Sequence, residues 1–361
     1  MIKTIRVLHT EWSDGWGGQE IRIIHEMQMM RSESVEVYLA CRENSMIKDK
    51  AIANNIKVFV LPFRGNVDLI TLLKLKKIIK YHSINIVNTH SGKDTWVGGL
   101  AAKLAGVKFI RTRHLSNKIN PSRLNFINEL ADYIFTTGEK VRDDMIEYNR
   151  IKENKIISIP TGIDDSIFDP ESFKRAECRK KFTINDSEIA IGILAVLRQF
   201  KRHDLFLKMA KSLIKKYPDK RLVFIIAGTG PQKENIEKII NEFNLAENVK
   251  MVGHINNVPE FLCAIDILVL SSDSKEGVPQ SVMQGLFMNK PVVSSDSGST
   301  RDLFNNNFQL IQKGSSEALV NGVSIYLDNI NEVSTRKYMM ENFSSSVMVK
   351  KIMTSYEKIL E

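Results

Sequence analysis

Cysteine is scarce in this sequence of 361 residues, and long apolar runs are missing altogether. Cys41, Cys178 and Cys263 are far apart and odd in number, which excludes a disulfide framework and fits a reducing compartment. No run approaches the ~18 apolar residues of a transmembrane helix. The start, Met1 to Arg6, lacks the apolar segment and cleavage site of a signal peptide. We therefore expect a cytoplasmic protein.

Several motifs that carry known chemistry are also missing. The sequence has no Asp-x-Asp, no Gly-x-Gly-x-x-Gly, no Gly-x-x-x-x-Gly-Lys-Ser/Thr and no Gly-x-Ser-x-Gly. These absences argue against a metal-diphosphate clamp, a dinucleotide fingerprint, a P-loop and a hydrolase nucleophile elbow. Histidine, cysteine and aspartate are not clustered at metal-ligand spacing. We expect no metal and no cofactor, and a nicotinamide-dependent oxidoreductase stays only as a disfavoured alternative.

The composition is that of a soluble globular protein, and the length suggests two domains. The formal net charge is +9, and residues 64–118 alone carry eleven Lys and Arg against two acids, so this segment equals the whole excess. A basic surface can meet nucleic acid, acidic lipid or a phosphorylated substrate. The segment lacks the interleaved aromatic residues typical of single-strand binding, so no nucleic-acid partner is expected.

Short β-branched runs alternate with longer helical patterns, and the alternation restarts in the second half. This rhythm predicts an α/β fold with two doubly wound parallel sheets. The expected strands are Ile5–His9, Val35–Leu39, Lys57–Leu61, Ile84–Asn88, Lys108–Arg111, Tyr133–Thr136, Ile189–Val196, Leu222–Ala227, Val249–Val252, Ile267–Leu270 and Pro291–Ser294. The expected helices are Gln19–Met30, Leu69–Tyr81, Trp96–Leu104, Asp204–Lys216, Lys233–Phe243, Val258–Ala264 and Gln280–Met288.

The join between the two domains is expected at Ile159–Asp164, where Pro160 and Gly162 interrupt a strand. The last residues, 343–361, form one helical pattern. We expect an N-terminal domain of residues 1–165 plus 343–361 and a C-terminal domain of residues 166–342.

Ligands of open parallel sheets bind beyond the carboxyl ends of the strands, so candidate residues are sought there. Gly17 and Gly18 follow the first strand, and Arg198 and Lys201 follow the strand Ile189–Val196. Glycines allow close backbone approach, and two cations can neutralise a diphosphate. For the Gly17-Gly18 pair, an ordinary tight turn is the alternative.

The segment Glu276–Ser281 predicts an anion site at a helix N-terminus. Pro279 suits the start of a helix, whose first free amides would belong to Gln280 and Ser281. Glu276 lies in the preceding loop, where a carboxylate can bind sugar hydroxyls. His90 and His114 each follow a strand of the basic domain, which favours a ligand-facing role over that of isolated polar residues.

Taken in order, these motifs resemble glycosyltransferase family 4, whose members are retaining enzymes with the GT-B fold. The stretches that carry the resemblance are Gly17-Gly18, Asn88-Thr89-His90, Arg111-Thr112-Arg113-His114, Ile159–Asp164, Leu197–Lys201, Ala227–Pro231, Val252-Gly253-His254, Glu276–Gln280 and Gly285–Gly298. The resemblance implies two Rossmann-like domains that face a central cleft, a nucleotide-sugar donor (UDP-, GDP- or ADP-sugar) and a glycan or lipid-linked acceptor. By analogy, the setting would be lipopolysaccharide or capsule synthesis.

The resemblance also assigns roles to single residues. His114, Arg198, Lys201 and Glu276 would be catalytic, with the two cations on the diphosphate and Glu276 on the donor sugar. The nucleotide-sugar would be bound by Gly17, Gly18, Gly228, Gly253, His254, Ile255, Val278, Gln280, Ser281 and Gln284. His90, Arg111 and Arg113 would bind the acceptor.

Two departures from the family pattern affect the donor site. The second acid of the family's Glu-x7-Glu motif, which holds the ribose, is replaced by the neutral amide of Gln284. Ser299 replaces one glycine of the pair that precedes Asp302. Gln284 leaves a non-catalytic nucleotide-sugar-binding protein as one alternative. A sugar-nucleotide epimerase, which can share the fold, is the other. The basic segment 64–118 would dock the acceptor-side domain on anionic lipid headgroups at the inner face of the cytoplasmic membrane, and an ordinary solvated helix face is the alternative.

Overall fold

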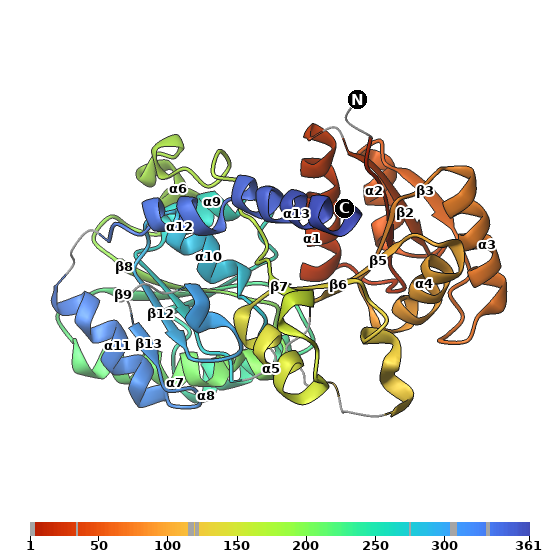
Figure 1. Cartoon of the computed structure of the whole chain (residues 1–361). Coiled ribbons are helices and arrows are strands. Elements are labelled where there is room, and N and C mark those ends of the chain that lie inside the picture. Colours follow the sequence, from red (N-terminus) through yellow and green to blue (C-terminus); the bar gives the residue numbers. More distant parts are fainter. Residues whose placement is uncertain are drawn as a thin grey trace. The chain divides into compact units, whose positions relative to one another are not determined.

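The computed structural model describes residues 4–33, 35–114, 119, 123–273, 276–303, 309–329 and 333–361. It divides into two compact units (Figure 1). Unit 1 comprises Met1–Gly162 together with Ser345–Glu361, and unit 2 comprises Ile163–Ser344. Each unit is a doubly wound parallel sheet with helices on both faces, as the alternation of strands and helices predicts.

Unit 1 contains a seven-stranded sheet in the order β3-β2-β1-β4-β5-β6-β7, and every neighbouring pair is parallel. The strands are β1 (Arg6–Thr10), β2 (Glu36–Cys41), β3 (Lys57–Val60), β4 (Ile86–Thr89), β5 (Lys108–Arg113), β6 (Tyr133–Thr136) and β7 (Ile156–Ser158). Because all strands run the same way, the carboxyl ends of β1, β4 and β5 lie side by side at one edge.

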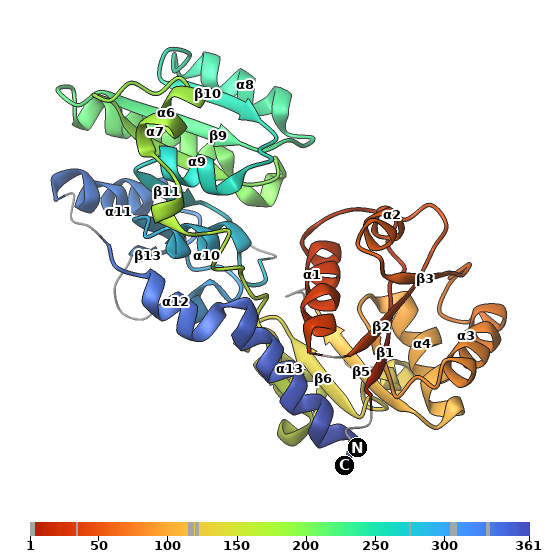
Figure 2. The ribbon, with the colours of Figure 1, turned by 90° about the horizontal axis from the view of Figure 1, so that it is seen from above.

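The helices of unit 1 cover the two faces of this sheet. They are α1 (Gly18–Ser32), α2 (Met46–Ala53), α3 (Leu69–Tyr81), α4 (Gly92–Ala105), α5 (Glu139–Asn149) and α13 (Ser345–Leu360), with short 3-10 turns η1 (Arg123–Asn128) and η2 (Glu153–Lys155). One apolar core joins α1, α2 and α13 to the sheet, and the other joins α3, α4 and α5. The C-terminal helix α13 lies beside α1 (Figure 2).

Unit 2 contains a six-stranded parallel sheet in the order β10-β9-β8-β11-β12-β13. Its strands are β8 (Ile189–Leu194), β9 (Leu222–Ala227), β10 (Val249–Gly253), β11 (Ile267–Leu270), β12 (Val292–Ser295) and β13 (Gln309–Ile311). Alternate residues of β9 enter opposite cores: Val223 and Ile225 pack on one face, and Phe224 and Ile226 on the other. Both faces are therefore buried, as is usual for a parallel sheet.

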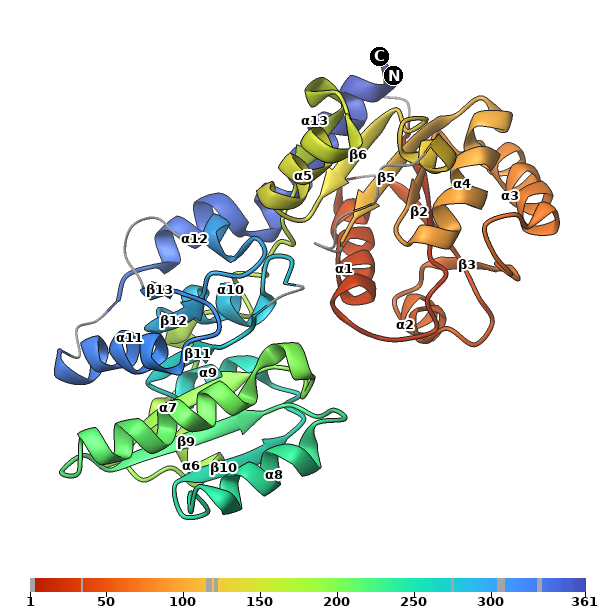
Figure 3. The ribbon, with the colours of Figure 1, turned by 90° about the horizontal axis from the view of Figure 1, so that it is seen from below.

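The helices of unit 2 divide between these two cores. They are α6 (Arg175–Lys181), α7 (His203–Lys216), α8 (Lys233–Glu242), α9 (Val258–Ala264), α10 (Gln280–Phe287), α11 (Ser316–Asp328) and α12 (Arg336–Phe343), with 3-10 turns η3 (Pro170–Ser172), η4 (Gln199–Lys201) and η5 (Thr300–Leu303). Helices α7, α8 and α11 pack on one face of the sheet (Figure 3), and α6, α9, α10 and α12 pack on the other.

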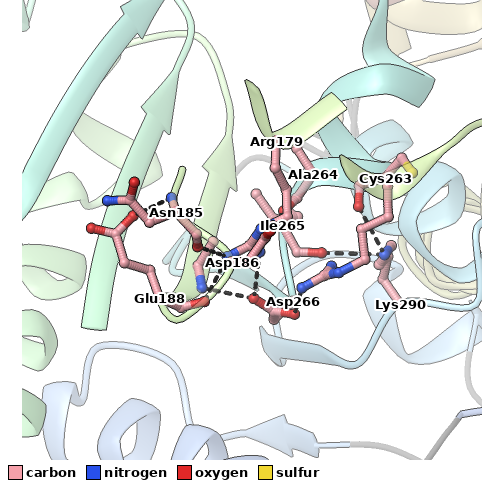
Figure 4. A network of polar contacts seen from close by, with 11 residues as sticks. Arg179, Asn185, Asp186, Glu188, Cys263, Ala264, Ile265, Asp266 and Lys290 are labelled. Carbon is pink, nitrogen blue, oxygen red and sulfur yellow. Dashed lines mark hydrogen bonds and ion pairs between the residues drawn. The ribbon is translucent and has the colours of Figure 1, made fainter. Parts of the chain in front are cut away.

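A buried arginine fixes the amino ends of β8 and β11 in unit 2 (Figure 4). Arg179 is 2% exposed and donates to the carbonyl oxygens of Asn185 at 2.5 Å, Glu188 at 2.6 Å and Ala264 at 3.2 Å. It also pairs with Asp266 at 3.2 Å. The fork of a guanidinium can satisfy several acceptors at once, so this residue closes the edge of the sheet opposite to the strand ends where ligands bind.

The structure differs from the expected elements mainly at short or capped segments. β13 and the helices α2, α5, α6, α11 and α12 are additional to the elements predicted. Helix α4 begins at Gly92 rather than Trp96, because Ser91 and Asp94 form a capping box at its start. The tail breaks at Ser344, so the last helix begins at Ser345. The two units divide between Gly162 and Ile163 and between Ser344 and Ser345.

We expect that Ile352→Ala destabilises unit 1 although Ile352 lies near the end of the chain. Its side chain is fully buried in the core shared by α1 and α13. Truncation of a buried isoleucine costs about 2–5 kcal/mol, because apolar contacts are lost and a cavity remains. Urea unfolding followed by fluorescence measures the change. The exposed Glu357 on the same helix gives the control Glu357→Ala, and equal stability of the two variants would contradict the role of α13.

Candidate active-site residues in the two units

An ion pair joins the loops that follow two adjacent strands of unit 2. Lys201 ends η4 after β8, and Glu276 lies in the loop after β11. The Lys201 Nζ and Glu276 Oε1 atoms are 2.5 Å apart, with side chains 15% and 8% exposed. Ser272 Oγ donates to the same carboxylate oxygen at 2.6 Å. Burial and the second donor hold this pair in one geometry, unlike an exposed surface pair.

Further hydrogen bonds tie the two loops together. Ser271 Oγ donates to the carbonyl oxygens of Lys201 at 2.8 Å and Arg202 at 3.0 Å. The Asp273 amide donates to the Phe200 carbonyl at 3.0 Å, and Arg202 Nη1 pairs with Asp273 at 3.2 Å. The backbone that carries Lys201 is therefore held by the loop that carries Glu276.

Gly298 supports Glu276 from behind. Its φ is +60°, and a Cβ atom at this position would overlap the carbonyl oxygen of Glu276. Only glycine tolerates both the left-handed conformation and the close approach. The next residue, Ser299, donates its amide to the Gly277 carbonyl at 3.2 Å. This bond uses the backbone alone, so serine in place of the family's glycine keeps it.

The helix after Glu276 begins where the sequence predicts. α10 starts at Gln280 with Pro279 as its N-cap, and the Met283 amide donates to the Pro279 carbonyl at 3.2 Å. The helix itself therefore leaves the amides of Gln280 and Ser281 available for an anion. Gln284 lies one turn further along and is half-buried.

The glycines at the ends of β9 and β10 bring backbones together. Gly228 has φ +142°, a Cβ there would overlap the Ala195 carbonyl, and its amide donates to the Gly253 carbonyl at 2.7 Å. His254 is exposed and Ile255 is half-buried against the core. The contacts explain why glycine occupies position 228. The nucleotide-binding roles of these residues and of the half-buried Val278 stay predictions.

Arg198 is exposed and precedes η4 as its N-cap. A cavity of about 630 Å³ opens beside it, and its walls include Phe200, Arg202, His203 and Gln232. Arg198 lines this cavity and can therefore reach a ligand there, and it takes no part in the Lys201–Glu276 ion pair.

Unit 1 brings two predicted histidines together and adds a third. His9 Nδ1 lies 2.9 Å from His90 Nε2, and His90 Nδ1 lies 2.9 Å from His114 Nε2. His9 and His90 are fully buried, and His114 is half-buried. The three residues come from β1 and from the positions just after β4 and β5, which are neighbours in the sheet.

A buried aspartate fixes the loop after β4. Asp94 accepts from the His90 amide at 2.9 Å, the Ser91 amide at 2.8 Å and Thr10 Oγ1 at 2.6 Å. The buried Arg111 donates to the Ser91 carbonyl and to the hydroxyl of Thr95.

His90 and Arg111 are thus buried and bonded within unit 1. Arg113 is 9% exposed, and burial lowers its pKa to about 10, with Arg111 adding to the shift. A direct contact of these three residues with the acceptor stays a prediction.

A second buried carboxyl, that of Glu11, directly follows β1 and lies before the glycine turn at the start of α1. Glu11 accepts from the Trp12 amide at 2.8 Å, the Ser13 amide at 2.7 Å and Gln19 Nε2 at 2.5 Å. Burial, with the charge of Asp94 adding to it, raises the pKa of Glu11 to about 8.

The predicted glycine pair lies at the start of this helix. Helix α1 begins at Gly18, and the Gly17 amide donates to Glu20 Oε2 at 2.8 Å in a capping box. The Gly17 amide is therefore bonded to a protein carboxylate. Contact of Gly17 and Gly18 with the donor stays a prediction.

Six buried polar residues at or near these strand ends were not predicted from the sequence. They are His9, Glu11, Arg22, Glu26, Asp94 and Ser272. Ser91-x-x-Asp94 is a capping-box pattern, so the helix start was readable from sequence. Arg22 and Glu26, an i,i+4 pair, are both buried, and Arg22 Nη1 donates to the Ile159 carbonyl at 2.7 Å. Their burial could not be read from spacing alone.

The described residues contain neither a group of side chains suited to a metal ion nor a helix suited to cross a membrane. In those residues, no three His, Cys, Asp or Glu side chains gather in a way that could hold a metal ion. Within the same part of the chain, no helix has both the length and the apolar character needed to cross a membrane.

Comparison with known proteins matches both parts of the chain. The family model described as Glycosyltransferase Family 4 matches residues 16–167, and that described as Glycosyl transferases group 1 matches residues 174–344. The UDP-Gal:alpha-D-GlcNAc-diphosphoundecaprenol alpha-1,3-galactosyltransferase of Escherichia coli is 24% identical, covering 98% of this chain and 96% of its own length. The O-antigen biosynthesis glycosyltransferase WbnH of Escherichia coli is 25% identical, covering 90% and 92%.

A solved structure shares the fold over nearly the whole chain. Anabaena HepE, crystallised in complex with UDP, superposes with a TM-score of 0.84 and 17% identity, covering 98% of this chain and 100% of the other. The chain belongs to the group 1, family 4 glycosyltransferases and has the GT-B fold. It is a glycosyltransferase, so the epimerase and oxidoreductase alternatives are set aside.

The raised pKa of Glu11 makes the stability of unit 1 depend on pH. A carboxyl whose folded pKa is raised from 4.5 to about 8 stabilises the fold fully below pH 4.5, and this stabilisation is lost as the pH rises through about 8. The slope is about 1.4 kcal/mol per pH unit for one proton. We expect Glu11→Gln, which is neutral throughout, to lack this slope.

Urea unfolding at pH 5, 6, 7 and 8 tests this expectation. The exposed Glu33 provides the control variant Glu33→Gln, which should keep the wild-type slope. If Glu11→Gln and the wild type lose stability equally between pH 5 and 8, Glu11 does not hold a proton in the folded protein.

Proposed function

We propose that the protein is a retaining glycosyltransferase that moves a hexose from a UDP-sugar to a hydroxyl of a lipid-linked glycan acceptor. The observation that carries this proposal is the buried Lys201–Glu276 pair at the carboxyl ends of β8 and β11. One member is a cation suited to a diphosphate, and the other is a carboxylate suited to sugar hydroxyls. The reaction would belong to lipopolysaccharide or capsule synthesis.

The donor is assigned to unit 2. Lys201 and the exposed Arg198 would neutralise the diphosphate, together with the amides of Gln280 and Ser281 at the start of α10. Negative charge grows on the diphosphate as the sugar departs, and groups already fixed in place stabilise that charge without reorganisation. Lys201 is fixed by its short bond to Glu276 and by the two Ser271 bonds on its loop.

Glu276 would bind and orient the donor sugar rather than attack it. Its Oε1 atom already accepts from Lys201 and Ser272, which lowers its strength as a nucleophile. We therefore propose that the anomeric configuration is kept without a covalent intermediate on this residue. The leaving diphosphate oxygen would take the proton of the acceptor hydroxyl.

Two similarities support the choice of donor and acceptor. The name of the Escherichia coli relative specifies a UDP-sugar and an acceptor linked to a lipid through a diphosphate. The structural relative from Anabaena was crystallised with UDP. In unit 1, we assign His114 to the transferred sugar and Arg113, with His90 and Arg111 behind it, to the acceptor.

Substitution of either Lys201 or Glu276 should abolish most of the sugar transfer. We expect Lys201→Ala and Glu276→Gln to lower kcat by about 10²–10³, which corresponds to about 2.7–4 kcal/mol of lost transition-state stabilisation. The assay offers UDP-galactose and UDP-glucose with a GlcNAc-diphospho-lipid acceptor and detects the product by mass spectrometry. NMR of the product reports the anomeric configuration.

A matched pair at the opposite edge of the same sheet provides the control. Arg175 Nη2 and Asp266 Oδ1 are 2.6 Å apart at the amino end of β11, so Arg175→Ala removes an ion pair of similar length away from the strand ends. It should transfer sugar at nearly the wild-type rate. Near-normal rates in folded Lys201→Ala and Glu276→Gln would refute the assignment, and UDP binding without any product would favour a non-catalytic binding protein.

We further propose that α3 docks unit 1 on an anionic membrane surface. Leu69, Ile70 and Leu73 are 67%, 48% and 59% exposed on this helix. The exposed lysines of the same helix, Lys74, Lys77 and Lys80, lie among them. Apolar side chains next to lysines suit a surface of acidic headgroups, where each basic residue contributes about 1 kcal/mol.

Vesicle co-sedimentation tests this docking. The triple variant Lys74→Gln, Lys77→Gln, Lys80→Gln should bind phosphatidylglycerol-containing vesicles about a hundredfold more weakly than the wild type, since about 3 kcal/mol is removed. The binding of the wild type should weaken as salt is added.

The control replaces three exposed lysines of α7 in unit 2, Lys208, Lys211 and Lys215, by glutamine. It removes the same charge from another helix and should leave vesicle binding unchanged. Wild-type binding that ignores both lipid charge and salt would refute docking through α3.

A further inference from the structure

Three histidine rings of unit 1 lie in a row across the ends of adjacent strands. The rings of His9 and His90 have nearly parallel planes, 9° apart, with centroids 5.2 Å apart, and the centroids of His90 and His114 are also 5.2 Å apart. A 2.9 Å contact between ring nitrogens joins each neighbouring pair. His90 uses both of its ring nitrogens in this row, and His114 uses only Nε2.

The row leaves little freedom for the protons. Each contact needs one N–H and one bare nitrogen, and a neutral imidazole carries a single N–H. The N–H groups must therefore all point toward His114 or all point toward His9. A single choice made anywhere in the row sets the tautomer of all three rings.

The three rings are neutral at pH 7. Burial lowers the pKa of His9 to about 3. Burial, together with neighbouring arginines, lowers the pKa values of His90 and His114 well below 6.5. His114 consequently does not serve as a charged acid, and its contribution depends on which of its nitrogens carries the proton.

Positive charge gathers at the His114 end of the row. Besides burial, the charges of Arg22, Arg111 and Arg113 all lower the pKa of His114, whereas burial alone lowers that of His9. Arg111 also donates to the Ser91 carbonyl next to His90. His9 Nε2 is buried with no hydrogen-bond partner among the described residues, whichever way the protons point. The burial of His9 Nε2 therefore favours neither direction of the N–H groups strongly. The positive guanidinium groups repel the ring protons, which favours N–H groups that point toward His9.

We propose that His9 and His90 are positioning residues that hold His114 in one neutral tautomer, with the proton on Nε2 and with Nδ1 bare to accept a hydrogen bond from a sugar hydroxyl. The contact with the sugar rests on the proposed function, whereas the tautomer is a property of the free protein. Asp94 supports the row, because it holds both the His90 amide and the Thr10 hydroxyl next to His9.

Long-range ¹H–¹⁵N NMR of the full chain labelled with [¹⁵N]histidine tests the tautomer without any substrate. The ring signals of His114 are assigned by their loss in His114→Gln. The expected result is one protonated nitrogen at Nε2 and one bare nitrogen at Nδ1. A proton on Nδ1, or signals averaged between the two tautomers, would overturn the proposal whatever the activity of the protein.

Variants of His9 test the dependence of His114 on the row. His9→Asn places an amide near the former Nδ1 atom and can still bond His90, whereas His9→Leu cannot. We expect His9→Leu to average the His114 tautomers and to lower kcat with UDP-galactose about tenfold, with KM for this donor within twofold. His9→Asn should restore both readouts, although a role in apolar packing alone would favour leucine over asparagine.

His9→Gln covers the case in which His9→Leu does not fold. Its amide extends to the former Nε2 position, so it is a polar variant that misses His90 and should behave like His9→Leu. His82, which packs against Tyr38 and Phe59 elsewhere in unit 1, gives the control His82→Leu with unchanged His114 signals. Unchanged His114 signals in folded His9→Leu or His9→Gln would show that the row does not set the tautomer. If the wild-type protein shows the Nε2–H tautomer of His114 but transfers no sugar, the result counts against the proposed function and not against the role of the row.

Discussion

The common direction of the strands is the constraint on which the rest of this structure depends. Every pair of neighbouring strands in both sheets is parallel, so all the carboxyl ends of a sheet meet at one edge. Loops that are distant in sequence therefore become neighbours. Lys201 and Glu276 are 75 residues apart in the chain, yet their side chains form one bond. The opposite edge is closed by Arg179, which has no part in the proposed chemistry.

Much of the fold was predictable, because a strand that is buried on both faces is a short, continuous apolar run that stands out from its polar flanks. Strands such as Leu222–Ala227, which are apolar throughout, have the predicted bounds. Some elements that escaped prediction are short, such as β13 with only three half-buried residues, whereas the missed helix α11 has 13 residues. The apolar pattern of β13 is too brief to stand out from a loop, and only pairing with β12 makes it regular.

Candidate site residues were predictable where they directly follow an apolar strand in the sequence. They were unpredictable where their role depends on burial within the folded unit. Lys201 and Glu276 were found from their positions after strands, and the structure brings them together. His9 escaped, because it lies inside the first predicted strand and meets His90 only through the sheet order β1-β4-β5. Arg111 was expected to contact the acceptor, which stays a prediction, and the sequence did not indicate that its buried side chain also bonds the loop after β4. Spacing along a chain does not tell which side of a strand end is buried.

The return of helix α13 to unit 1 has a consequence for the synthesis of this protein. Met27 on α1 and Tyr356 on α13 belong to one core, although residues 163–344 are translated between them. Unit 2 is continuous and can complete its core while translation proceeds. Unit 1 is made first, but the part of its apolar core that α13 covers stays exposed until this helix emerges from the ribosome. The order in which the units are encoded is thus the reverse of the order in which they can finish folding, and the nascent N-terminal unit is the part most in need of protection from aggregation.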